Sequence, residues 1–392
     1  WIPGAPAPPL VLYVSPQGDG STGEDWAHAF QTITSATQAI QSSALQPGDD
    51  LYEIRVAAGT YREGHQIYVP SPRVALVGGW SGNVSIPGER DATIYKTVVD
   101  GENAYRCILS GGHLDGLLVQ NGKTEGCGGG ISMWSGTVKD CTVTQCVVDL
   151  PPESYYDGGG GIYAFEGSVI HSTIVENSVR GGLYGLGLNG GGGILCYASH
   201  VVIASCTVVG NSVVDGGDST TYDNFGGGIG FWADGAVVTN CIVMDNSAPD
   251  GGGIGGDFAC FYYHPGLISN CTVVGNYSTR YGSGGVADIH EIANSIIYSN
   301  YNKAGQISNV SYNTQVAYSC VGGNPGFVST EGSDPLKWNL RLQSDSPCID
   351  GGIIDVASLV SKGDLSLLMD TDLQGHSRVQ GLSVDMGAYE FS

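Results

Sequence analysis

A glycine-rich phrase that recurs six times between Cys127 and Asn300 restricts the fold of this chain more than any other feature. Each copy opens with glycines and an aliphatic residue, and closes with a small residue followed five positions later by a polar one. The openers are Ile131, Ile162, Ile194, Ile229, Ile254 and Val286, and the closing pairs are Cys141/Cys146, Ser172/Asn177, Cys206/Asn211, Cys241/Asn246, Cys271/Asn276 and Ser295/Asn300. Successive pairs lie 31, 34, 35, 30 and 24 residues apart. A fixed pair at variable spacing indicates a repeated coil that accepts loops of different length at one place.

The segments between the glycine runs are short and rich in Thr, Val and Ile, as in Cys271–Asn276. Such alternation predicts short strands, and no segment between copies has the length or the Ala, Leu, Glu and Lys content of a helix. Leucine-rich repeats are the alternative solenoid, but the Leu spacing that they need is missing. We therefore predict an all-β fold, a parallel β-helix with coils of about 22 to 25 residues.

Equivalent positions in such a solenoid stack about 4.8 Å apart, so the closing pairs predict two internal rows. One row holds small residues and the other holds Asn177, Asn211, Asn246, Asn276 and Asn300. We expect these Asn residues to take the left-handed turn conformation and to hydrogen-bond along the axis. Several of the 11 cysteines fall in the small-residue row, so we expect free thiols in the core, with a disulfide framework as the alternative.

The whole chain, residues 1–392, is predicted to be one domain with four parts. Residues 10–60 supply a strand and a capping helix, expected at 25–43, and 61–126 supply the first coils. Residues 127–300 are the six repeats, and 301–392 are the final coils and a C-terminal cap. The helix would cover strand edges that the open end of the solenoid leaves unpaired. Asp370–Gly375 has a faint calcium-loop pattern with too few ligands, so a turn is favoured and Ca²⁺ remains an alternative cofactor.

The charge of the chain restricts its partners. It has 38 acidic and 15 basic residues and a net charge of −23, which argues against nucleic acid and against an anionic membrane surface. A polyanionic substrate would need bound cations or a local basic patch. No run of about 18 apolar residues exists, so we predict no membrane insertion.

Motifs at both ends carry a resemblance to a known family. They are Tyr13–Gly20, Trp26–Phe30, Val56–Tyr61 and Leu76–Trp80 in the N-terminal half, and Trp338–Leu342, Ser346–Gly352 and Asp385–Phe391 in the tail. The first group resembles secreted right-handed parallel β-helix proteins of polysaccharide-degrading bacteria, which are polysaccharide-lyase-like. The second resembles the C-terminal segment called choice-of-anchor Q. The resemblance implies a right-handed single-stranded coil, a secreted or cell-surface location and a polysaccharide partner. It names no chemistry, because the fold carries lyases, glycosidases, epimerases and adhesins.

Two surfaces are candidates for substrate binding. Loops before each glycine run leave the coil at one corner, and we predict that Tyr155, Tyr156, Asp157, Tyr222, Asp223 and Asp250 on them bind substrate. Aromatic residues also follow the openers by three positions, at Trp134, Phe165, Tyr197 and Trp232. Pointing away from the core, they would form either a platform for sugar rings, with Trp134 and Trp232 in contact with substrate, or a stack that seals the corner.

The aromatic series breaks in the fifth copy, where Asp257 begins an aromatic insert that contains Tyr262, Tyr263 and His264. A local failure of a regular pattern is where function is expected. Arg280, Tyr281 and His290 follow on this copy and the next. β-Elimination from a uronate needs a base, an acid and a cation over the carboxylate. We predict catalysis by His264, Tyr263, Tyr281, Arg280 and Asp257, and substrate binding by Tyr262 and His290.

Two alternatives to a polysaccharide lyase stay open. A glycoside hydrolase would use a pair of carboxylates, and Asp157, Asp223, Asp250 and Asp257 are expected near one edge on successive copies. A non-catalytic carbohydrate-binding or adhesive surface protein would use the same aromatic residues without chemistry.

Overall fold

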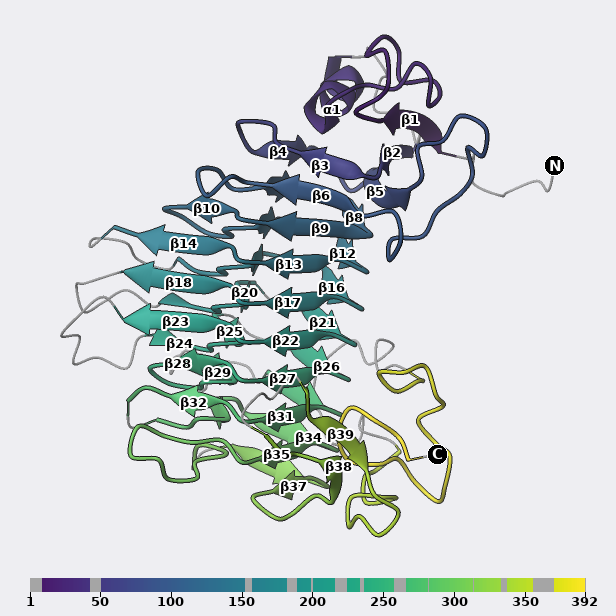
Figure 1. Cartoon of the computed structure of the whole chain (residues 1–392). Helices are drawn as coiled ribbons and strands as arrows, with labels where there is room; N and C mark the ends of the chain where they lie inside the picture. The colour runs from purple at the N-terminus through teal and green to yellow at the C-terminus, as the bar shows by residue number, and fades with distance from the viewer. Residues whose placement is uncertain are drawn as a thin grey trace.

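The chain folds into a right-handed, single-stranded parallel β-helix with one helix at its N-terminal end (Figure 1). The computed structural model describes residues 9–42, 51–151, 157–181, 189–198, 200–215, 224–232, 236–256, 266–280, 282–312, 314–332, 337–354 and 370–391. Four long parallel sheets stack along the axis in these ranges. The predicted fold class is therefore confirmed.

The four sheets are numbered here in the order in which one repeat visits them. Sheet 1 contains the aliphatic openers: β4 (Ile67–Val69), β7 (Ile108–Ser110), β11 (Ile131–Met133), β15 (Ile162–Ala164), β20 (Ile194–Cys196), β25 (Ile229–Phe231), β29 (Ile254–Gly256) and β33 (Val286–Ala287). Sheet 2 contains β1 (Leu10–Val14), β2 (Tyr52–Ala57), β5 (Val74–Trp80), β8 (His113–Asp115), β12 (Thr137–Lys139), β16 (Ser168–Ile170), β21 (Val202–Ala204), β26 (Val237–Thr239), β30 (Leu267–Ser269), β34 (Glu291–Ala293) and β36 (Gln315–Ala317).

Sheet 3 contains β3 (Gly59–Tyr61), β6 (Thr97–Asp100), β9 (Leu117–Gln120), β13 (Thr142–Thr144), β17 (Thr173–Val175), β22 (Thr207–Val209), β27 (Ile242–Met244), β31 (Thr272–Val274), β35 (Ile296–Tyr298) and β37 (Cys320–Val321). Sheet 4 contains β10 (Lys123–Thr124), β14 (Val147–Leu150), β18 (Ser178–Gly181), β23 (Ser212–Asp215), β28 (Ser247–Ala248) and β32 (Tyr277–Ser278). Two short pairs complete the strands: parallel β19 (Asn189–Gly190) with β24 (Asn224–Phe225), and antiparallel β38 (Phe327–Ser329) with β39 (Asn339–Leu342).

The openers of successive repeats pair in register inside sheet 1. Ile131 pairs with Ile162, Ile162 with Ile194, and the series continues to the pair of Ile254 with Val286. Each repeat passes through sheets 1, 2, 3 and 4 and returns to sheet 1, and the loops of variable length connect sheet 4 to sheet 1. The repeat read from the sequence is therefore one turn of the solenoid. Its variable loops lie between sheets 4 and 1, but the insert of the fifth copy departs from this expectation and lies between β29 of sheet 1 and β30 of sheet 2.

An asparagine row runs through the core, as predicted. Asn177, Asn211, Asn246, Asn276 and Asn300 are at most 1% exposed, and each donates from its amide nitrogen to the amide oxygen of the next, over 2.9–3.0 Å. The row ends at Asn309, which accepts from Asn300. Stacked amides thus satisfy the polar groups of a narrow core.

The prediction that these Asn residues take the left-handed turn conformation is wrong by one position in the sequence. The left-handed residue is the one before each Asn, for example Glu176 with φ of 56° and Asp245 with φ of 54°. That residue makes the corner, and the following Asn places its amide inside the coil. A side chain at the corner itself would not reach the next amide along the axis.

The small-residue row is made of free thiols and hydroxyls that accept from the backbone of the preceding coil. Cys206 donates its backbone N–H to the sulfur of Cys241 at 3.3 Å, and Cys141 donates to the hydroxyl of Ser172 at 3.1 Å. All ten cysteines in the described ranges are free, which confirms the core-thiol expectation there. Burial raises the pKa of the Cys141 thiol to about 12, so this thiol stays protonated and unreactive at neutral pH.

The single helix of the described ranges, α1 (Ile33–Ser42), starts later than the predicted 25–43. Thr32 caps it, because the Thr32 hydroxyl accepts from the Ser35 backbone N–H at 3.1 Å. Upstream, the Asp25 carboxylate instead accepts from the His28 backbone and closes a turn. Apolar Trp26 packs near Trp80 rather than on a helical face. Ile33 and Ala36 of α1 join the main core at the N-terminal end of the solenoid.

The C-terminal segment packs on the outer face of sheet 3. Val209, Ile242 and Met244 of that face form a second apolar cluster with Phe327, Leu340, Leu342 and Cys348. Figure 1 shows β38 and β39 beside β31 and β35. No helix in the described ranges is long and apolar enough to cross a membrane.

Candidate functional site

The insert of the fifth repeat leaves the solenoid at the corner between sheets 1 and 2. Its flanks are β29, which ends at Gly256, and β30, which begins at Leu267. Asp257, Tyr262, Tyr263 and His264 lie outside the described residues. In the next coil, His290 lies between β33 and β34, which is the same corner. The chain path therefore places His290 one coil step from the insert.

Arg280 belongs to the opposite end of sheet 1. Arg280 follows β32 of sheet 4 and precedes β33, and its carbonyl accepts from the backbone N–H of Lys303 at 3.2 Å. Tyr281 lies outside the described residues. Since Arg280 precedes β33 and His290 follows it, the two leave the coil at different corners. The grouping of Arg280 and Tyr281 with the insert therefore stays a prediction.

The aromatic row lies on the same corner as the insert. Trp134 and Phe165 are 48% and 39% exposed, and Tyr197 and Trp232 are half-buried. Phe165 stacks on Tyr197 with ring centroids 5.6 Å apart, and Tyr197 stacks on Trp232 at 6.1 Å. The row thus continues from coil to coil and reaches Trp232 in the coil that precedes the insert.

The aromatic row was predicted to be either a platform for sugar rings or a stack that seals the corner, and each interpretation fits different residues of the row. Tyr197 has a neighbouring ring on each side, so its faces serve packing along the axis. Trp134 is tilted by 59° relative to Tyr68 and leaves about half of its surface open. The middle of the row is suited to sealing the corner, whereas Trp134 at its N-terminal end offers a free aromatic surface.

The loop corner between sheets 4 and 1 contains the two described aspartates of the predicted substrate site. Asp157 contacts the Cys127 thiol, with 3.1 Å between sulfur and carboxylate oxygen. Asp250 accepts from the backbone N–H groups of Gly251 and Ser283, and burial nevertheless raises its pKa. Tyr155, Tyr156, Tyr222 and Asp223 lie outside the described residues.

Asp157 and Asp250 do not form a hydrolytic pair. Asp157 precedes β15 and Asp250 precedes β29, and the strand order β15–β20–β25–β29 separates them by three coil steps. Three steps correspond to about 14 Å along the axis. The two carboxylates of a glycosidase lie about 5 to 9.5 Å apart. Pairs that include Asp223 or Asp257 stay predictions.

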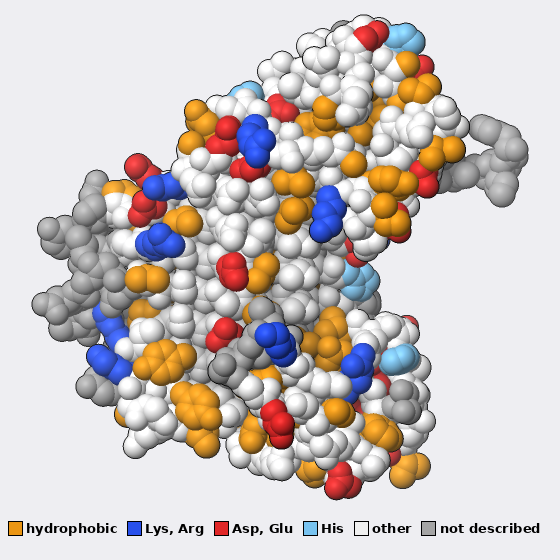
Figure 2. Space-filling model, viewed as in Figure 1, with side chains coloured by type: hydrophobic (Ala, Val, Ile, Leu, Met, Phe, Trp, Pro, Cys, Tyr) orange, Lys and Arg blue, Asp and Glu red, His pale blue; other side chains and the backbone are white. Residues whose placement is uncertain are grey.

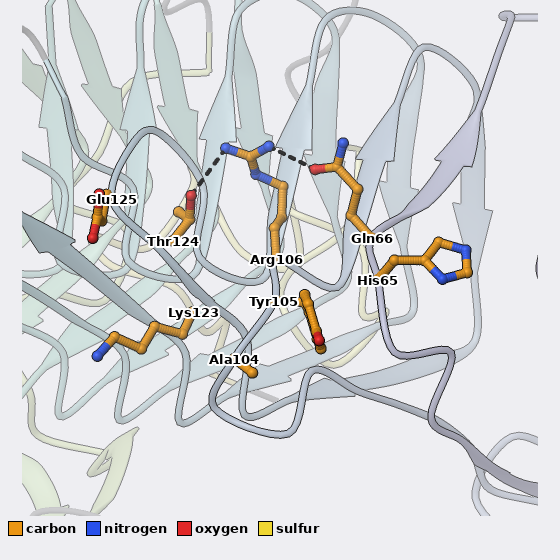
Figure 3. A pocket seen from close by; sticks show the side chains of 8 residues that line it. All are labelled: His65, Gln66, Ala104, Tyr105, Arg106, Lys123, Thr124 and Glu125. Atoms are coloured by element: carbon orange, nitrogen blue, oxygen red, sulfur yellow. Dashed lines mark hydrogen bonds between the residues drawn. The ribbon is translucent and has the colours of Figure 1, made fainter.

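A depression of about 570 Å³ lies at the loop corner of the first coils (Figure 3). Residues 65–66, 104–106 and 123–125 line it. The register of β7 with β11 places Arg106 at the position that Gly129 holds in the next coil. Sequence reasoning missed this site. The signal was present, because Tyr105 and Arg106 stand before the opener Ile108 where later copies have glycines.

Arg106 is held at this depression by neutral groups. Its Nε donates to the carbonyls of Cys127 and Gly128, and its Nη2 donates to Cys127 at 2.7 Å. Its Nη1 donates to the Gln66 amide oxygen at 2.9 Å. In Figure 3 the guanidinium lies between Gln66 and Thr124, and Lys123 and His65 extend away from it on either side. The guanidinium is therefore fixed in direction by its neighbours.

Metal ligands are not gathered in the parts of the chain that the structure describes. No group of three or more His, Cys, Asp or Glu side chains is arranged there to hold an ion. In the predicted calcium-like loop, one Asp372 oxygen accepts from the backbone of Gln374 and His376, and the other accepts from Glu390. Asp372 is therefore used by the turn itself, in agreement with the favoured interpretation.

Comparisons with known proteins do not assign a reaction to this chain. The sequence matches no protein-family model and no curated protein sequence. Among solved structures, the crystal structure of the pectate lyase Pel9A is similar, with a TM-score of 0.49 and 16% sequence identity. The alignment covers 98% of this chain and 97% of that one. At this level of likeness, no substrate and no residue role is transferred to this chain.

Proposed function

We propose that this protein is an extracellular polysaccharide-binding protein that cleaves a uronate-containing glycan by β-elimination. One observation carries the proposal: the aromatic row and His290 lie at the same corner of the solenoid, and the flanks β29 and β30 of the insert meet that corner in the coil between them. A linear glycan is the ligand that matches a linear row of sites, because each further sugar meets a further coil. Trp134 supplies the open aromatic surface of this row.

The proposed reaction needs three groups around one uronate residue. A base, proposed as His264, removes the proton from the carbon next to the carboxylate, and those electrons form the carbon–carbon double bond. The bond to the neighbouring glycosidic oxygen breaks, and an acid, Tyr263 or Tyr281, gives that oxygen a proton. A cation over the carboxylate stabilises the charge of the intermediate, and Arg280 is not assigned this role because it precedes β33 at the other corner. Asp257 is proposed to orient the base.

The test is the absorbance of unsaturated sugar at about 235 nm during incubation with uronate polysaccharides, which only elimination produces. We expect His264→Ala to lower kcat by about 10²- to 10⁴-fold. His113→Ala, at an exposed position on β8, is the matched control and should keep the full rate. Full activity of His264→Ala and Tyr263→Phe would remove the insert from the mechanism, and full activity of Tyr281→Phe would remove Tyr281. New reducing ends without absorbance would indicate hydrolysis.

Binding without cleavage is the second candidate function. It is favoured by the aromatic row itself, which extends over four coils whether or not the insert is catalytic. Retained glycan binding, with neither absorbance nor new reducing ends, would identify the protein as a carbohydrate-recognition scaffold.

A further inference from the structure

The depression at Arg106 is separate from the corner that carries the aromatic row. It is lined by residues that precede β4 and β7 in sheet 1 and by β10 of sheet 4, so it lies at the loop corner. The row follows the sheet 1 strands and lies at the other corner. A volume of about 570 Å³ is within the range of ligand clefts and admits a sugar residue. Tyr105 at its rim is 42% exposed.

Arg106 differs from the other cations of the first coils in the character of its partners. Three of them pair with a carboxylate: Arg62 with Asp100, Arg90 with Asp115, and Lys123 with Asp149. In the described ranges, Arg106 bonds only to carbonyl, amide and hydroxyl oxygens. In a chain of net charge −23, a half-buried guanidinium without a carboxylate partner is an exception.

Burial of this charge has an energetic cost that neutral partners offset only in part. Burial lowers the pKa of Arg106, as expected for a cation removed from water, although the group stays protonated at neutral pH. A neutral hydrogen-bond donor would be enough to bind the carbonyls of Cys127 and Gly128, so this structural role does not explain the positive charge of Arg106. A negative group that enters the depression would supply the missing counter-charge, and it would accept a charge-assisted hydrogen bond from the second N–H of Nη1, which Gln66 does not use.

The surroundings of Arg106 favour a singly charged sugar acid. Gln66, Thr124 and Tyr105 offer the amide, hydroxyl and aromatic groups that contact sugar hydroxyls and ring faces. Glu125 lines the same depression, and Lys123 is already paired with Asp149. A phosphate dianion would therefore meet a carboxylate and only one uncompensated cation, whereas one carboxylate matches one guanidinium.

We propose that the Arg106 depression is a binding subsite for the carboxylate of a uronate residue, with Tyr105 and Gln66 contacting its hydroxyl-bearing ring. This inference rests on the proposed glycan function and deepens it, since it names an acidic sugar as the ligand of the first coils. It requires binding alone, so it can be tested whether or not the insert performs elimination.

The experiment measures the affinity of an oligogalacturonate and of its methyl ester by calorimetry, with absorbance read in parallel to detect cleavage. Arg106→Gln is expected to weaken binding of the acid by about tenfold or more and to leave the ester unchanged. Arg62→Gln is the matched control, because it removes the same charge from an exposed arginine that pairs with buried Asp100 in the neighbouring coils, and it should bind like the native protein.

Glu125→Gln gives a test of opposite sign that does not depend on the fold of the Arg106 variant. Glu125 is exposed, so its substitution should preserve the structure, and removal of its charge is expected to tighten acid binding about two- to fivefold. Equal affinities of Arg106→Gln and Arg62→Gln would overturn the proposal. So would equal affinity of the native protein for acid and ester, no binding of the acid, or no gain with Glu125→Gln. Absence of cleavage with the expected affinities would instead overturn only the proposed elimination.

Discussion

At the scale of single residues, the core Asn side chains do what an apolar side chain cannot. The Asn211 amide oxygen accepts from both the backbone N–H and the amide nitrogen of Asn177, at 3.0 Å each. Its own amide nitrogen donates to Ile174 and to Asn246. The Asn211 side chain therefore satisfies groups in the preceding coil and in the following coil. The position demands both a donor and an acceptor, which explains why Asn recurs there.

Asn211→Ala is expected to lower the free energy of unfolding by about 3 kcal/mol, because it leaves the buried N–H of Asn177 without an acceptor and opens a cavity. Chemical denaturation measures the change. Asn83→Ala is the control: Asn83 is exposed and its side chain accepts from the Ser85 backbone N–H, so loss of this side chain should cost no more than about 0.5 kcal/mol. Equal effects of the two substitutions would show that the row adds little to stability.

At the scale of elements, different residues of the aromatic row are suited to packing and to ligand recognition. Tyr197 has a ring on both sides and Trp134 is half open to solvent. A residue enclosed by its neighbours contributes mainly to stability, and a residue open to solvent is available to a ligand.

Trp134→Ala is therefore expected to weaken glycan binding about tenfold with less than about 1 kcal/mol lost in stability, whereas Tyr197→Ala should cost about 2 kcal/mol. Affinity electrophoresis in a polysaccharide gel and thermal unfolding measure the two effects. A large stability loss from Trp134→Ala with unchanged binding would assign the entire row to packing.

The elements also show which structural features could be predicted from sequence. The glycine phrase was sufficient to predict the coil, its sheets and the corner of most loops. The reason is that openers such as Ile131 and Ile162 pair with each other, so their spacing in the sequence gives the register between successive coils. The start of α1 could not be read, since Trp26 has helical spacing but packs near Trp80. That contact depends on a strand more than fifty residues away.

The candidate site was less predictable than the fold. The aromatic row was found because it repeats. Arg106 was missed because a single departure from a repeat is visible only once the register of Ile108 with Ile131 is known. The distance between Asp157 and Asp250 likewise depends on how many coils lie between them, and sequence proximity to a common edge does not reveal it.

At the scale of the whole molecule, buried carboxylates set the response to pH. Burial raises the pKa of Glu390 from 4.5 to about 7, which outweighs the guanidinium of Arg378 at 3.0 Å. Burial also raises the pKa of Asp250, Glu291 and Asp385. A carboxyl group with a raised folded-state pKa binds its proton more tightly in the folded protein. Its contribution to stability is complete below pH 4.5 and is lost as pH rises toward 7.

The melting temperature is therefore expected to fall as pH rises from about 5 to 8, because these carboxyls ionise in the core and self-repulsion of the acidic chain grows. Below about pH 4 the sign reverses, since hydrogen bonds hold the pKa of Asp91 below its ordinary value. Differential scanning calorimetry across this range gives the curve. Glu390→Gln should flatten its alkaline side, and an unchanged slope would exclude Glu390 as a source of the pH dependence.

The asparagine row has a direction, and this bears on the order in which the protein is made. The backbone N–H of each Asn always donates to the coil that follows it in sequence, as Asn211 does to Asn246 and Asn276 does to Asn300. A ribosome releases the N-terminal coils first, so each new coil emerges with donors that only the next one can satisfy. The nascent chain is thus open at its growing end until Asn309 arrives to accept from Asn300. A chain shortened from the C-terminus would expose this unfinished edge, because its last Asn would have no acceptor in a following coil for its buried backbone N–H.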